Sequence, residues 1–293
     1  MLLLTGATGL VGSTVLRRLV AEGTPVRCLV RDPRRLGPLR VRVQIALGDL
    51  TDPPSFRNAL RGVHTVVHLA GAIRDQRRGS IEELNGIATW RMVEAAERSG
   101  VERFVFFSVL GASPHHRARL LRAKALAEKA VVEAQLRSTV FAPSIIYAPG
   151  DPWLTLLERL ALLPVMPVSG RGRARFQPIW VEDVADCLVR SLHDGGSKAD
   201  ERFELAGPQT LTHEEIVRTV LASLARNRPL LHVPTPIVSR SLRLLERIAG
   251  EKAFATWDEA ELMEVPMIST RGTADPQALG VTPQPMAAVL GTR

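Results

Sequence analysis

In the stretch MLLLTGATGLVGSTVLRRL, residues 1–19, three glycines follow directly on a run of apolar residues. The apolar run before the first glycine predicts a short buried strand, and the amphipathic pattern after it predicts a helix. Gly6, Gly9 and Gly12 fall between the end of that strand and the first turn of the helix. Glycines at this spacing in a strand–turn–helix unit are typical of a loop that brings backbone amides against a pyrophosphate. We therefore predict a dinucleotide-binding loop at this point.

Each glycine has its own predicted role. Gly6 permits the sharp turn out of the strand, Gly9 lets the backbone approach the pyrophosphate, and Gly12 lets the helix pack closely on the sheet. Free amides at the start of the helix, together with its dipole, favour an anion, and two threonine hydroxyls are further donors. The predicted contacts in this loop are Thr5, Gly6, Thr8, Gly9, Leu10 and Gly12. A glycine-rich turn without a ligand is the alternative.

Strand-like runs alternate with helical patterns through the first half of the chain, which predicts an α/β protein. Because connections between parallel strands are right-handed, this order predicts a doubly wound parallel sheet, the Rossmann fold. The predicted strands are residues 2–5, 26–30, 42–46, 65–69, 103–107 and 138–142. The predicted helices between them are residues 10–22, 54–61, 81–98 and 117–136.

The composition of the sequence changes after residue 143, where prolines become frequent. We predict a dinucleotide-binding core over residues 1–150. The smaller, mostly helical portion over residues 151–293 is predicted to close the crevice on the substrate side without folding independently. Its predicted elements are helices at 181–193, 213–226, 236–249 and 258–264 and a strand at 202–207. The apolar segment 151–168 is predicted to pack onto its own domain, with a hydrophobic pocket or a protein contact as alternatives.

The composition limits the classes of partner. The chain has 293 residues and a formal net charge of +8, but its basic residues are dispersed and no zinc-ligand pattern accompanies them, so no nucleic-acid partner is expected. No apolar run reaches the roughly 18–20 residues of a membrane span, and no signal peptide is recognisable. Cys28 and Cys187 lie far apart in apolar runs. Because of this separation they do not form a metal-ligand pattern, and no metal is expected. They are predicted to be buried thiols in a reducing compartment, so the predicted location is the cytoplasm.

The residues after the second predicted strand indicate which dinucleotide binds. An acidic residue usually lies here when the cofactor is NAD, because it holds the adenosine ribose hydroxyls. This chain has Arg31 at that position and Arg34 close behind, and guanidinium groups suit a 2′-phosphate. We predict NADP as the cofactor. NAD stays open, because Asp32 is one residue away and a small change in the turn would restore an acidic contact.

Several motifs occur in a fixed order along the chain. They include TGATGLVG at 5–12, HLAGA at 68–72, GVERFVFFS at 100–108 and PIWVEDVADCL at 178–188. With these motifs the chain resembles the extended and atypical short-chain dehydrogenase/reductases over nearly its whole length. SVLGASPHHRARLLRAKALAEKAV and the C-terminal LGVTPQPMAAVL are most similar to the branch related to the 39-kDa NAD(P)H-binding accessory subunit of respiratory complex I, and NmrA-like sensors are close relatives.

The resemblance implies further contacts with the dinucleotide. Asp49 would accept a hydrogen bond from the adenine amino group, with Leu50 packing beside the ring. Ala70 and Gly71 would form a backbone wall under the adenosine ribose and phosphate. The stretch beside the nicotinamide would begin at Pro143 and Ser144.

The catalytic motif of that family is incomplete in this chain. Its reductases carry a tyrosine four residues before a lysine, so that the tyrosine exchanges a proton while the lysine lowers its pKa and binds the nicotinamide ribose. Here the lysine is Lys124 and the earlier position is Leu120, while Ser108 matches the serine that orients the substrate carbonyl. Tyr147 is the single tyrosine of the chain and lies in a different motif, so we predict that it packs in the core.

Two functions remain open from the sequence. In the first, Lys124 holds the ribose and the protein binds NADP(H) in an accessory or sensing role, with a protein partner. In the second, Lys124 acts as a general base without the tyrosine, with Ser108 beside it, in an NADP-dependent oxidoreductase or isomerase that takes a small apolar or carbonyl substrate.

Overall fold

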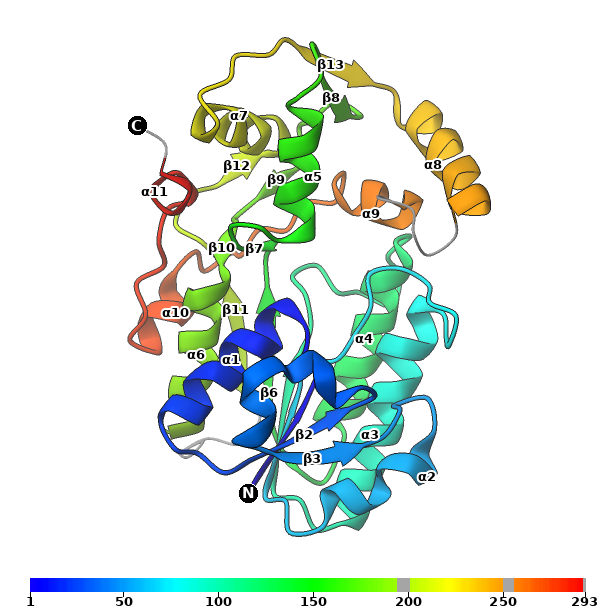
Figure 1. Cartoon of the computed structure of the whole chain (residues 1–293), viewed down its shortest axis with the longest axis vertical. Helices are drawn as coiled ribbons and strands as arrows, with labels where there is room; N and C mark the ends of the chain where they lie inside the picture. Colours follow the sequence, from blue (N-terminus) through cyan, green and yellow to red (C-terminus); the bar gives the residue numbers. More distant parts are fainter. Residues whose placement is uncertain (194–200, 250–255, 292–293) are drawn as a thin grey trace.

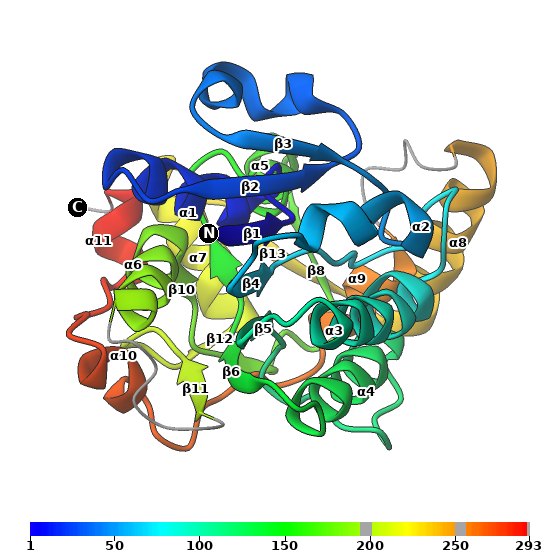
Figure 2. The same cartoon turned by 90° about the horizontal axis from the view of Figure 1, so that it is seen from below.

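The computed structural model describes residues 1–193, 201–249 and 256–291. In this part of the chain the main sheet consists of β1 (Leu2–Thr5), β2 (Val26–Val30), β3 (Gln44–Leu47), β4 (Thr65–His68), β5 (Arg103–Phe107), β6 (Arg137–Pro143) and β11 (Glu201–Leu205). All of its strand pairs are parallel, in the order β11-β6-β5-β4-β1-β2-β3. Figure 1 shows the whole chain, and Figure 2 labels each strand of this sheet. The predicted doubly wound α/β fold is thereby confirmed.

The strand order reverses between β1 and β4, which pair with Thr5 opposite His68. Every residue of β1 and β5 is buried, which agrees with their mostly apolar sequences. Ligands of open α/β sheets bind beyond the carboxyl ends of the strands at such a reversal. The fold therefore directs attention to the loops that follow β1 and β4.

Helices cover both faces of the sheet, as Figure 2 shows from below. One face carries α1 (Leu10–Ala21) and α6 (Val181–His193), which are joined by ion pairs from Arg17 and Arg18 to Glu182. The other face carries α2 (Pro53–Phe56), α3 (Ala88–Arg98) and α4 (Arg119–Val132). Each face has its own buried apolar cluster against the sheet.

A second portion lies over the carboxyl ends of the strands (Figure 1). Its strands form short pairs, β7 (Ile146–Tyr147) with β10 (Ile179–Trp180), β8 (Met166–Ser169) with β13 (Leu230–Val233), and β9 (Arg175–Phe176) with β12 (Leu211–Thr212). Its helices are α5 (Pro152–Leu160), α7 (His213–Ser223), α8 (Thr235–Ala249), α9 (Trp257–Leu262) and α11 (Met286–Leu290), whereas α10 (Ala274–Ala278) packs beside β11 of the main sheet. Tyr147 is fully buried in the core of this portion.

Several element boundaries differ from those predicted. The helix predicted at 54–61 divides into α2 and a 3₁₀ turn (Arg57–Leu60), and the helix predicted at 81–98 contains a π-helical turn (Glu83–Ile87) before α3. The two-residue strands were not predicted, because a strand that short shows no periodicity. α6 and β11 follow residue 151 in sequence, yet they complete the main sheet and its helical layer.

Within residues 1–193, 201–249 and 256–291 no helix is long and apolar enough to span a bilayer. The same ranges contain no group of three or more His, Cys, Asp or Glu side chains placed to hold a metal ion.

Candidate functional site

The glycine loop after β1 is shaped by close backbone contacts. Gly6 has a φ of +72°, and a Cβ at this position would lie 2.6 Å from the amide nitrogen of Ala70. A Cβ at Gly12 would overlap with the carbonyl oxygen of Gly6, so α1 packs against the loop only because residue 12 is glycine. Gly9 precedes the first residue of α1 and has an ordinary extended conformation. These contacts match the predicted roles of Gly6 and Gly12.

The first turn of α1 presents free amides at this loop. No side chain caps the helix at Gly9, and no acidic residue lies in its first turn. Leu10 is 38% exposed and Thr8 is half-buried beside it. Unsatisfied amides and the positive end of a helix dipole together bind anions well.

Thr5 lies beneath the loop and does not face the solvent. Its hydroxyl is buried, lies 2.9 Å from Nδ1 of His68 and accepts a 3.4 Å hydrogen bond from the amide of Ala70. This differs from the predicted contact between the Thr5 hydroxyl and the pyrophosphate. The hydroxyl instead ties the loop after β1 to the loop after β4.

A buried polar chain continues from Thr5 under both loops. The ring of His68 is fully buried, and its Nε2 lies 3.1 Å from the hydroxyl of Thr89. The Thr89 hydroxyl donates to the backbone carbonyl of Asn85 at 2.7 Å. Burial, together with the nearby charge of Lys124, lowers the pKa of His68 to about 3. The imidazole is therefore neutral and serves as a hydrogen-bonding bridge.

This neutral imidazole makes the fold sensitive to acid. In the unfolded chain His68 takes up a proton near pH 6.5, whereas in the folded protein it does so only near pH 3. The unfolded state binds more protons between these values, so the free energy of unfolding falls as the pH drops, by about 2 kcal/mol from this residue between pH 7 and pH 5. Urea unfolding at both pH values should show that His68→Gln loses about 2 kcal/mol less than the wild type over this interval. Equal losses would show that another group titrates.

Asn85 fixes the loop after β4, and the sequence interpretation did not identify it. Its side-chain amide donates to the carbonyls of Ala72 at 2.7 Å and Ile81 at 2.9 Å, and its Oδ1 accepts from the amide of Ala72 at 3.3 Å. A Cβ at Gly71 would lie 2.6 Å from that oxygen, so Gly71 allows the close approach. One signal was present in the sequence: Asn85 occupies a buried position in an otherwise apolar helical pattern.

Lys124 points from α4 to the carboxyl end of β5. Its ammonium donates to the carbonyl of Phe107 at 2.7 Å and lies 5.0 Å from the centroid of the Phe106 ring. A Cβ at Gly71 would lie 3.3 Å from the same nitrogen, so the lysine and the loop after β4 meet. Burial lowers the pKa of Lys124 to about 8, although the charge of Glu128 opposes the shift.

Ser108 and Ser144 have different surroundings at this end of the sheet. The Ser108 hydroxyl is buried directly after β5 and has no hydrogen-bond partner in the described part of the chain. The Ser144 hydroxyl, by contrast, donates to Met267 at 2.7 Å and accepts from the amide of Gln177 at 3.0 Å. It links β6 to the second portion, at the start of the stretch that is predicted to lie beside the nicotinamide. The neighbouring Pro143 is buried at the end of β6.

Arginines surround Asp49 after β3. Its carboxylate accepts a 2.7 Å bond from Arg78 and two bonds from Thr51. Burial opposes ionisation, but these bonds outweigh it and hold the pKa of Asp49 below its ordinary value, with a further contribution from the charge of Arg31. Both oxygens already accept hydrogen bonds, and the neighbouring Leu50 packs against the core.

The acidic residue at the end of β2 is also engaged. Asp32 accepts bonds from the backbone amide and from Nε of Arg34, each at 3.0 Å. Arg31 is exposed beside this pair. The side of the site that follows β2 and β3 is therefore positively charged, with its carboxylates held by arginines.

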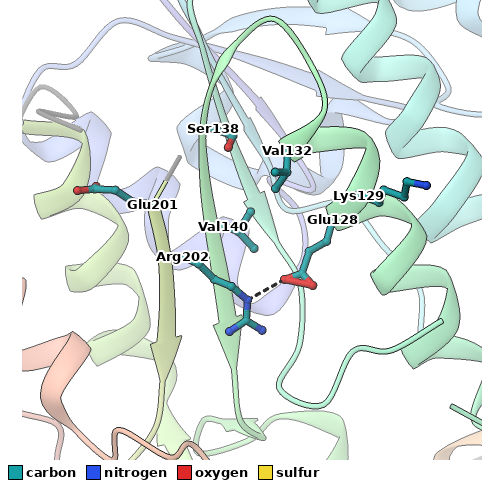
Figure 3. Close-up of a pocket in the computed structure, with 7 residues that line it drawn as sticks. All are labelled: Glu128, Lys129, Val132, Ser138, Val140, Glu201 and Arg202. Atoms are coloured by element: carbon teal, nitrogen blue, oxygen red, sulfur yellow. Dashed lines mark hydrogen bonds and ion pairs between the residues drawn. The ribbon is translucent and has the colours of Figure 1, made fainter. Parts of the chain in front are cut away.

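A cavity of about 420 Å³ lies elsewhere, in the groove between α4 and the edge of the sheet (Figure 3). An ion pair of 3.1 Å between Arg202 and Glu128 crosses it. None of its lining residues belongs to the glycine loop or to the loop after β4. The residues that line it are Glu128, Lys129, Val132, Ser138, Val140, Glu201 and Arg202.

The residues at the strand reversal fit a dinucleotide. Gly6 and Gly12 allow the loop after β1 to approach the loop after β4 and the first turn of α1 closely, and Ser108 has a buried hydroxyl without a partner among the described residues. This combination of fold and site defines a protein of the dinucleotide-binding Rossmann class. The chain belongs to the NAD(P)H-binding family, which it matches over residues 6–195.

The chain is similar in sequence to a plant protein and to a bacterial protein. A subunit of Arabidopsis thaliana, "NADH dehydrogenase [ubiquinone] 1 alpha subcomplex subunit 9, mitochondrial", is 32% identical over 245 residues, which cover 79% of this chain and 60% of the relative. A "ceramide reductase" of Caulobacter vibrioides is 32% identical over 188 residues, covering 64% of this chain and 59% of the relative. These findings confirm the predicted family resemblance, although the chain spans only about 60% of the length of either relative.

The fold recurs in solved structures. An NADPH-dependent quinone oxidoreductase of Escherichia coli, complexed with NADPH, superposes with a TM-score of 0.78 at 16% identity. The match covers 99% of each chain. At this identity the likeness shows the shared fold alone.

Proposed function

We propose that this protein holds NADP(H) in an accessory or sensing role, and that it lacks the tyrosine which the related reductases use for proton transfer. The observation that carries this proposal is the pair Leu120 and Lys124 on α4. Leu120 is 8% exposed and packs in the apolar core, one helical turn before the lysine. A leucine cannot exchange a proton, whereas Lys124 still reaches the carboxyl end of β5.

A protein partner fits this role. The Arabidopsis relative is by name a subunit of NADH dehydrogenase. Cys28 and Cys187 are buried free thiols, and burial raises the pKa of both to about 12 and keeps them protonated. Thiols that stay reduced in this way support the cytoplasm as the location.

A second function is favoured by two observations at the carboxyl end of β5. The Ser108 hydroxyl, which has no partner among the described residues, and the lowered pKa of Lys124 would suit an NADP-dependent oxidoreductase or isomerase, in which the serine donates to a carbonyl oxygen and the lysine moves a proton. The Caulobacter relative is by name a reductase.

Turnover separates the two functions. Titration with NADPH, followed by nicotinamide fluorescence, is expected to show binding, while assays with carbonyl and quinone substrates are expected to show no oxidation of NADPH. NADPH oxidation that rises with pH through about 8 and disappears in Lys124→Ala would establish the second function. If neither NADPH nor NADH binds, both functions are wrong.

The preference for NADP depends on the arginines after β2. Arg31→Asp is expected to weaken NADPH binding by about tenfold to a hundredfold, because a charge-assisted contact to the 2′-phosphate is lost and an anion is added. The affinity for NADH should stay within about threefold of the wild type, since NADH has no such phosphate. Arg57→Asp, on the exposed turn after α2, is the matched control. Equal losses for NADPH and NADH would contradict the assignment.

A further inference from the structure

Two segments carry the whole formal net charge of the chain. Residues 159–175 contain four arginines and no acidic residue, and residues 226–249 contain five arginines and one glutamate. The rest of the chain has 29 basic and 29 acidic residues, so the +8 belongs to these two segments. We call them together the basic tip. Basic residues occur along the whole sequence, but outside the basic tip they are equal in number to the acidic residues.

The fold brings the two segments together. β8 and β13 form a parallel pair with Leu231 opposite Pro167. Arg226 donates to the carbonyl of Ala161 at 3.0 Å, which holds the turn before β13 against the end of α5. Figure 1 shows β8 and β13 at the end of the molecule opposite the amino-terminal ends of the main sheet, with no labelled element beyond them.

The outer face of this strand pair is apolar. Met166 and Val168 are buried against the core, and because side chains alternate along a strand, Pro167 and its partner Leu231 belong to the other face. Large apolar side chains are exposed here and next to it, with exposed fractions of 62% for Leu162, 45% for Leu163, 54% for Leu231 and 54% for Ile237. A cluster of exposed apolar residues within a charged surround marks an interaction surface.

Six arginines of the basic tip have no ion-pair partner in the part of the chain that the structure describes. Among the described residues, no carboxylate forms an ion pair with Arg159, Arg171, Arg173, Arg226, Arg228 or Arg240. The nearest carboxylates have other partners, since Glu264 accepts from Thr235 and Glu214 pairs with Arg218 and His232. Glu264 lines a cavity of about 620 Å³ together with Arg171 and Arg173, so the cavity itself has mixed charge.

We propose that the basic tip docks the protein on the surface of an anionic phospholipid bilayer. Leu162, Leu163, Leu231 and Ile237 would enter the boundary between headgroups and acyl chains, while the arginines around them contact lipid phosphates. The helix α8 follows β13, and its sequence is basic and amphipathic, with arginines at positions 240, 243 and 247. Binding of this kind needs no membrane-spanning helix.

A nucleic acid suits this surface less well. Single-stranded nucleic acids are held by basic grooves with aromatic side chains on which bases stack. Residues 159–175 and 226–249 contain no Phe, Trp or Tyr. Exposed leucines placed among arginines match a lipid interface, which offers an apolar layer below a layer of phosphate.

Vesicle flotation with the full chain tests the proposal. The wild type should float with vesicles of phosphatidylcholine and phosphatidylglycerol in equal parts, and should stay behind with phosphatidylcholine alone. Each arginine near an anionic surface contributes about fivefold to partitioning, so Arg171→Glu with Arg240→Glu should reduce binding by at least about 25-fold. Leu162→Ser with Leu163→Ser should reduce it by about tenfold.

Matched controls keep the test specific. Val41→Ser removes an apolar side chain that is 81% exposed elsewhere, and Arg57→Glu reverses an exposed charge on the turn after α2, so neither should change flotation. Thermal melting and NADPH affinity should stay at wild-type values in every variant, because these residues lie outside the glycine loop. Absence of flotation, equal binding to both vesicle types, equal losses in the controls, or tighter binding to single-stranded DNA than to vesicles would each overturn the proposal.

Discussion

Gly9→Asp is expected to lower the affinity for NADPH by at least about a hundredfold. A carboxylate about 4 Å from a diphosphate charge costs about 4 kcal/mol near a protein surface. The side chain would also occupy the space above the first turn of α1. Fluorescence titration measures the loss, and NADH should lose affinity to the same extent because both nucleotides share the diphosphate.

The fold should tolerate this change. A Cβ at Gly9 meets nothing closer than the Gly6 carbonyl oxygen at 3.4 Å, and the residue has an ordinary extended conformation. Thermal melting should therefore stay close to that of the wild type. Asn58→Asp, an exposed site at the opposite ends of the strands, adds the same charge and should leave affinity unchanged. Undiminished binding by Gly9→Asp would show that the loop does not carry the diphosphate.

Lys124→Met is expected to weaken dinucleotide binding by about tenfold to a hundredfold, because a buried charge-assisted donor is lost. Methionine has a similar length and fits beside the Phe106 ring. The wild-type affinity should also decline as the pH rises through about 8, where the ammonium loses its proton, and this decline should be absent from the variant.

Lys129→Met is the matched control on the same helix, because the side chain of Lys129 is 69% exposed. It should bind NADPH as the wild type does at every pH. Unchanged affinity in Lys124→Met would place the nicotinamide ribose away from α4.

Much of the fold could be predicted from local pattern. The strands of a parallel sheet are buried on both faces and read as mostly apolar runs, as β1 and β5 do. The glycine positions were equally predictable, since Gly12 is required by the backbone contact of α1 with the turn. The strand pairs β7–β10 and β9–β12 were not, because two residues cannot establish a period.

The residues that hold the loops of the site in place could not be predicted from sequence motifs. His68 contacts Thr5, which is 63 residues away in sequence, and Asn85 holds the backbone of a loop residue 13 positions before it, whereas a helical or strand pattern indicates only that both side chains are buried. The prediction for Thr5 depended on its residue type alone, because a hydroxyl donor suits a phosphate. The direction of that hydroxyl depends on a histidine 63 residues away, which only the fold brings close.

The proposed function requires that the amides at the start of α1 hold the diphosphate of NADP(H). A crystal structure of the full chain grown with NADPH is the decisive experiment. We expect diphosphate density above Gly9 and Leu10, with the 2′-phosphate beside Arg31 and the nicotinamide ribose within reach of Lys124. Density for the nucleotide at any other place, or a glycine loop closed by protein side chains, would contradict it.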